Sequence, residues 1–237
     1  MSADAELRPG LFPSTRWTLV LAARGEPEQR RRALEELVAP RWKALYVLGR
    51  KQGLGRAEAE DAVQSFLARL VEGDLLSRVD PERGRLRAFL RTAFHNHLAN
   101  LREHAGAGKR GGGRRALDLE DVEALVAAPG PAPDRLYDRA WALAIFEETL
   151  AALEEELRAG ERRGPAGALR ALFGFAEAPP YATLARDLEM TVPQLKSFVH
   201  RAKGRFRQLL RGRVADTLEA GEDVDAEVAA LLEALGS

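Results

Sequence analysis

A segment late in the chain, residues 190 to 215, carries many basic side chains and no acidic one. Apolar residues recur every three or four positions through the same segment, which predicts an amphipathic helix. The basic side chains of such a helix lie on its solvent-exposed face. A face of this kind attracts the phosphate groups of nucleic acid. The basic residues are Lys196, Arg201, Lys203, Arg205, Arg207, Arg211 and Arg213.

A shorter helix is predicted just before this one, with Leu184, Ala185 and Leu188 on its apolar face. Thr191 and Gln194 have the spacing of a capping box, which starts the second helix. Two amphipathic helices joined by so few residues predict a helix-turn-helix, whose second helix enters a DNA groove. A helical hairpin with a solvated basic face is the alternative.

The predicted turn contains Glu189 at a position where such turns often have glycine. A residue other than glycine rarely adopts a left-handed backbone conformation. We therefore expect a turn wider than usual at this point.

Composition limits the classes of protein to consider. The chain has 237 residues, is 46% hydrophobic and contains no cysteine, so it can bury an ordinary core but forms no disulfide or thiolate metal site. No apolar run is long enough for a membrane span or a signal peptide, and we expect a cytoplasmic protein with no membrane partner.

Charge is segregated along the chain, although Lys plus Arg and Asp plus Glu both number 36. Residues 81 to 115 are mostly basic, residues 118 to 161 mostly acidic, and the tail after Arg213 carries acidic residues alone among its charged side chains. Acidic regions repel DNA and suit contacts with protein. One hypothesis from this pattern is that the acidic tail folds back on the basic segments.

The pattern of apolar residues predicts an all-α fold. We expect two helical domains, residues 1 to 104 and 134 to 237, joined by a flexible basic linker rich in Gly and Pro over residues 105 to 133. The first predicted helix begins after Ser14 or Thr15, and a later one begins near residue 134. The other predicted helices cover about 28 to 52, 56 to 72, 85 to 104, 166 to 175 and 224 to 235, with the helix-turn-helix at about 181 to 210.

Three short motifs, taken in order, resemble the extracytoplasmic-function sigma factors of bacteria or a divergent subgroup like them. They are AEDAVQSF at residues 59 to 66, DPERGRLRAFL at 80 to 90 followed by His95 and Asn96, and YATLA at 181 to 185 with His200 and Arg201. The opening Ser14-Thr15-Arg16-Trp17 is similar to the start of that subgroup. Departures are Ser65, where an acidic residue is usual, Glu189, and an enlarged segment between Glu154 and Pro180.

The resemblance implies a sigma factor, which directs core RNA polymerase to promoter DNA and helps to open it. The helix at 56 to 72 would bind the polymerase, and the helix at 85 to 104 would face the minus-ten element and the opened strand. The second helix of the helix-turn-helix would meet the minus-thirty-five element. The implied site residues are Asp61, Gln64 and Arg69 for polymerase; Arg87, Arg91, His95, Asn96, Asn100 and Arg102 for the minus-ten element; and Gln194, Lys196, Ser197, His200, Arg201, Lys203 and Arg205 for the recognition helix.

Two alternatives remain open at this level. The chain could be a stand-alone DNA-binding regulator that does not bind polymerase, or an interaction protein that offers the same basic faces to an acidic partner. Whether a separate anti-sigma protein holds it inactive is also open. We expect no catalytic residues, no metal site and no cofactor, because no nucleophile and base form a recognisable motif and His95 and His97 point to different sides of their helix.

Overall fold

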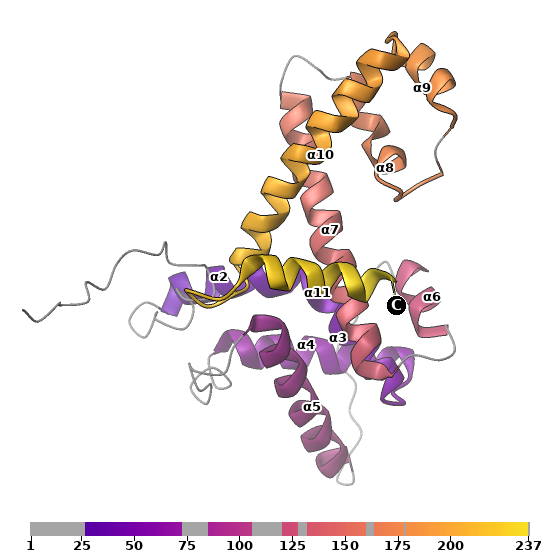
Figure 1. Cartoon of the computed structure of the whole chain (residues 1–237). Coiled ribbons are helices and arrows are strands. Elements are labelled where there is room, and N and C mark those ends of the chain that lie inside the picture. The colour runs from indigo at the N-terminus through magenta and orange to yellow at the C-terminus, as the bar shows by residue number, and fades with distance from the viewer. Residues whose placement is uncertain are drawn as a thin grey trace, which may run out of the picture.

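The structure is a computed structural model that describes residues 27–72, 85–105, 120–127, 132–159, 164–177 and 179–236. These residues form helices and connecting turns, with no strand among them, so the predicted all-α class is confirmed for this part of the chain (Figure 1). The helices are α2 (Pro27–Val38), α3 (Trp42–Lys51), α4 (Arg56–Glu72), α5 (Leu86–Ala105), α6 (Glu120–Ala127), α7 (Pro133–Ala159), α8 (Leu169–Leu172), α9 (Tyr181–Asp187), α10 (Val192–Ala215) and α11 (Val224–Gly236), with 3₁₀ turns η1 (Ala39–Arg41) and η3 (Gly164–Ala168).

Most predicted helices are confirmed, and the structure differs from the prediction at two places. The helix expected from 28 to 52 is broken at η1, which contains Pro40, because proline lacks an amide hydrogen and disfavours helical geometry in the residue before it. Helix α6 lies inside the segment predicted to be a linker. The helix predicted after Ser14, the loop from 80 to 84 and most of the remaining linker lie outside the described residues.

The long helix α7 runs through the middle of the molecule and connects its two ends (Figure 1). Its first half packs against α3, α5 and α11, and its second half packs against α10 and α8. Tyr137, Trp141, Ile145 and Leu150 on α7 are all fully or almost fully buried, as expected of a helix with neighbours on several sides. The buried apolar residues of both predicted domains belong to one continuous cluster among the described residues.

Two elements from the end of the chain complete the arrangement. Helices α9 and α10 form a hairpin far from α5, and α10 then runs back along α7 (Figure 1). After a turn that includes Gly221, with φ of 94°, α11 crosses α7 close to the first turn of α5. Of the helices that the structure describes, none combines the length and apolarity needed to cross a membrane.

Candidate nucleic-acid interface

The predicted capping box is present at the start of α10. The Thr191 hydroxyl oxygen accepts a hydrogen bond from the Gln194 amide at 3.3 Å, and the Gln194 side-chain oxygen accepts one from the Thr191 amide at 2.8 Å. Pro193 lies in the first turn, where its missing amide hydrogen costs no helical hydrogen bond. These reciprocal bonds fix where the second helix of the hairpin begins.

The turn between α9 and α10 is not the wider turn that the sequence predicted, because Glu189 itself adopts the left-handed conformation. Glu189 has φ of 54°, the one described residue other than glycine with a positive φ. The Met190 amide donates to the Ala185 carbonyl at 2.8 Å, and the Glu189 amide donates to the Arg186 carbonyl at 3.0 Å. This pair of bonds is a Schellman motif, which closes α9 tightly without glycine.

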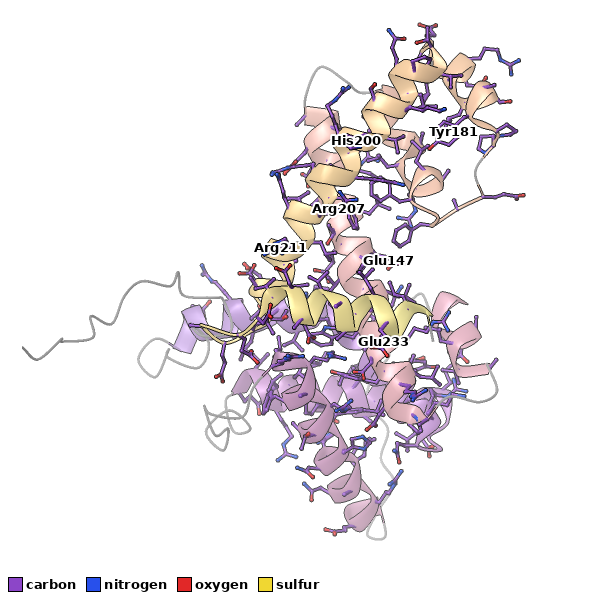
Figure 2. The ribbon with its side chains drawn as sticks, viewed as in Figure 1. Glu147, Tyr181, His200, Arg207, Arg211 and Glu233 are labelled. Atoms are coloured by element: carbon purple, nitrogen blue, oxygen red, sulfur yellow. The ribbon has the colours of Figure 1, made fainter. Side chains whose placement is uncertain are left out.

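The residues predicted to contact DNA on α10 are exposed, whereas Phe198 and Val199 are buried as their spacing indicated. Figure 2 shows His200, Arg207 and Arg211 following one another along α10 from the hairpin toward α11. In the part of the chain that the structure describes, no ion pair engages Lys196 or Arg201. The exposed predicted residues are Gln194, Lys196, Ser197, His200, Arg201, Lys203 and Arg205.

Two of these side chains already have partners. The Gln194 side-chain oxygen is used by the capping box, so its side-chain nitrogen is the group that can donate to a ligand. Arg205 forms two hydrogen bonds of 2.8 Å with Glu156 on α7, and this contact raises the pKa of its guanidinium. Arg205 thus joins α10 to α7 in this conformation, and Lys196, Ser197, His200, Arg201 and Lys203 form the more accessible surface.

The arginine face of α5, which we define as Arg85 just before the helix together with Arg87, Arg91 and His95, is covered by carboxylates. Arg87 donates from Nε to Glu227 on α11 at 3.0 Å, and its Nη1 lies 2.7 Å from Asp138 on α7. Arg85 also pairs with Glu227. Acidic side chains from two later helices therefore meet on one side of α5.

The remaining members of the arginine face have acidic partners on α7. Arg91 Nη1 donates to Asp138 at 3.3 Å, and its Nε lies 3.9 Å from Asp134. His95 Nε2 lies 3.1 Å from Asp134. The sequence did not identify Asp134, Asp138 or Glu227 as functional, although the charge segregation and the acidic tail pointed to such a contact.

The ion pair between Arg87 and Glu227 is largely withdrawn from solvent, which strengthens its electrostatic attraction. Glu227 is only 2% exposed, and Arg87 is more than four-fifths buried beside it. Burial acts to lower the pKa of the Arg87 guanidinium, but the Glu227 and Asp138 carboxylates outweigh it and hold that pKa above its ordinary value. Ion pairs withdrawn from water are screened less by salt than exposed pairs, so this contact persists at ionic strengths that weaken surface pairs.

A second face of α5 remains open to solvent. Asn96 and Asn100 are exposed and one helical turn apart, so both are accessible to a ligand. Arg102 is also exposed, but it donates to the Gln52 carbonyl at the end of α3 at 2.8 Å. The structure thus separates the predicted minus-ten residues into an open amide face and a covered arginine face.

The predicted polymerase-binding residues lie on α4. Asp61 and Gln64 are exposed, whereas Arg69 is partly buried and its Nη1 lies 3.4 Å from His97 Nδ1. His97 is buried against α4, with its Nε2 2.9 Å from the Ser65 hydroxyl. His95 and His97 point to different sides of α5, as their spacing predicted. Among the described residues, no group of three or more acidic or histidine side chains is arranged to hold a metal ion.

In comparisons with protein-family models, with curated proteins and with solved structures, nothing matches the chain.

Proposed function

We propose that the protein is a sigma-type transcription initiation factor that brings core RNA polymerase to promoter DNA and has no catalytic activity of its own. The observation that carries the proposal is the α9–α10 hairpin, which presents Lys196 and Arg201 on an open, well-capped helix. Positive charge on such a helix supplies affinity for the DNA backbone, and neighbouring polar side chains can read base edges in the major groove.

The second contact with DNA would come from α5. Asn96 and Asn100 are exposed, and an amide side chain can donate to and accept from a base edge. The arginine face would hold phosphates of the opened strand, as basic grooves do in proteins that bind single strands. Asp61 and Gln64 on α4 lie on an exposed surface suited to a protein partner, which in this proposal is the polymerase.

The test combines polymerase capture with promoter binding. The full chain should be retained by immobilised core RNA polymerase and should support run-off transcription from DNA selected by the complex. Lys196→Ala and Arg201→Ala should each weaken promoter binding about tenfold without changing capture by polymerase, because a phosphate contact or a base contact is lost.

A matched control is Arg32→Ala, which removes an exposed basic residue on α2 that pairs with Glu28 and lies outside the α9–α10 hairpin. This variant should bind the promoter like the unmodified protein. If the chain is not retained by core polymerase, the sigma-factor proposal is wrong.

One observation supports a second candidate, a regulator that binds duplex DNA without polymerase. The α10 surface is open while the arginine face of α5 is covered, so the free protein is prepared for duplex DNA alone. Tight, sequence-selective binding of a duplex in the absence of polymerase, together with no capture by polymerase, would favour this candidate.

A further inference from the structure

The carboxylates on the arginine face come from helices that follow the predicted linker. Glu227 on α11 contacts Arg85 and Arg87, and Asp138 on α7 contacts Arg87 and Arg91. A carboxylate and a phosphate offer arginine the same kind of charged oxygen acceptor. The acidic side chains therefore occupy the hydrogen-bonding groups that a nucleic-acid backbone would use.

From this geometry we infer that α11, with the first turns of α7, is an internal lid that keeps single-stranded nucleic acid off the arginine face of α5. The inference rests on the proposed nucleic-acid contact of α5 and adds its regulation. The lid covers the residues suited to phosphates but leaves Asn96 and Asn100 exposed. Binding of a strand along α5 then requires displacement of Glu227, and the free protein binds such a strand weakly.

The construction of α11 suits a movable element. Residues 216 to 223 connect α11 to α10, and α11 also packs on α7. Lifting α11 from α5 is therefore a rotation about this connection that separates α11 from α7 as well, while α10 stays packed on α7. Glu227 and Leu231 are the buried residues of α11, and Leu232 on the same helix is half exposed. The ion pairs of Glu227 therefore contribute much of the specific attachment of α11 to α5.

Contacts around the preceding turn complete the attachment. The Leu86 amide, in the first turn of α5, donates to the Thr217 carbonyl between α10 and α11 at 3.1 Å. Arg211 near the end of α10 pairs with Asp225 at the start of α11. Because α10 also carries the recognition surface, these contacts link the lid to the helix that would bind duplex DNA.

The test neutralises the lid while keeping its shape. Glu227→Gln and Asp138→Asn each replace a carboxylate with an amide of similar size, so arginine loses a charged competitor for phosphate. Asp138 is 23% exposed and therefore easier to replace than Glu227, and it serves if Glu227→Gln does not fold. The control is Glu233→Gln, because Glu233 is an exposed acidic residue of the same helix (Figure 2).

The readout is the affinity of the full chain for a fluorescent single-stranded oligothymidine, measured over a range of salt concentrations. Each lid variant should bind about tenfold more tightly than the unmodified chain, because the coupling between close charge pairs amounts to at least this factor. Two additional phosphate contacts should steepen the dependence of log K on log salt by about 1.4. Glu233→Gln should change neither quantity.

A second readout, binding of selected duplex DNA, separates this inference from the proposed function. Tighter single-strand binding by the lid variants supports the lid whether or not duplex binding is found. Unchanged single-strand binding by a folded lid variant, with the same salt dependence, overturns the lid. If the protein does not bind duplex DNA, or binds it equally well without Lys196 and Arg201, the result counts against the proposed function. Single-strand binding by the lid variants decides in that case too whether the lid exists.

Discussion

At the scale of single residues, His97 shows how a buried titratable group gains a structural role. It lies between Phe66 and Phe94, with its ring nitrogens near the Ser65 hydroxyl and the Arg69 guanidinium. A neutral ring with its proton on Nε2 satisfies both neighbours, since Nδ1 then accepts from Arg69. Burial, followed by the charge of Arg69, lowers the pKa of His97 below its ordinary value.

This lowered pKa predicts a loss of stability in mild acid. Below the ordinary histidine pKa of about 6.5, the unfolded chain binds a proton at His97 that the folded chain resists, so the free energy of unfolding falls as the pH falls. The contribution is fully present above a pH of about 6.5 and declines by at most about 1.4 kcal/mol per pH unit until the folded-state pKa is reached.

Urea denaturation between pH 7.5 and 5 measures this effect. His97→Gln, which retains a donor toward Ser65, should lower stability at pH 7.5 but reduce its dependence on pH. His200→Gln is the matched control, because it makes the same replacement at an exposed histidine on α10. An identical pH dependence in the protein and in His97→Gln would contradict the assignment.

At the scale of the elements, the turn between α9 and α10 stores backbone strain at Glu189. A left-handed conformation costs a residue with a side chain roughly 1 kcal/mol or more, whereas glycine adopts it freely. Glu189→Gly should therefore raise the free energy of unfolding by about 0.5 to 1 kcal/mol, after allowance for the greater freedom of glycine in the unfolded chain.

The matched control places the same substitution where the backbone is helical. Glu155→Gly, at an exposed position of α7, should lower stability by about 1 kcal/mol because glycine weakens a helix interior. Thermal unfolding of both variants measures the two effects. Destabilisation by Glu189→Gly would show that the Glu189 side chain contributes more than its backbone costs.

The elements that the sequence predicted are those set by local patterns. The α9–α10 hairpin follows from apolar spacing and from Thr191 and Gln194, which are close in sequence. Helix α6 was not predicted, because a tertiary contact helps to define it: Glu123 accepts hydrogen bonds from Tyr46 and Arg50 on α3, both at 2.5 Å. The partners of Arg87 were equally hidden, since residues far apart in sequence meet only after α7 and α11 are packed.

At the scale of the whole molecule, a charged cluster joins three distant parts of the chain. Arg41 in η1 is 3% exposed and lies over the Trp141 ring, and its Nη1 donates to the Leu37 carbonyl at 2.6 Å. Glu148 on α7 lies 3.4 Å from Arg41 and 3.3 Å from Arg213 on α10. Burial raises the pKa of Glu148, and the two guanidinium groups oppose that rise.

Removing the charge of Glu148 should loosen this junction. Glu148→Gln leaves the buried Arg41 without its compensating carboxylate, and breaking a buried pair in this way costs about 3 kcal/mol or more. Because Glu148 is 21% exposed, we expect a smaller loss of about 2 kcal/mol in the free energy of unfolding. Glu147→Gln, one position away, should stay within about 0.5 kcal/mol of the unmodified protein.

Urea denaturation also tests whether this junction links the two ends of the molecule. Unfolding is monitored by tryptophan fluorescence and by circular dichroism. Since α7 packs on α3 at one end and on α10 at the other, the two signals should change together in the unmodified protein. In Glu148→Gln the midpoints should fall together if α7 alone keeps the ends coupled. Midpoints that separate only in this variant would instead show that the charged cluster is required for the coupling.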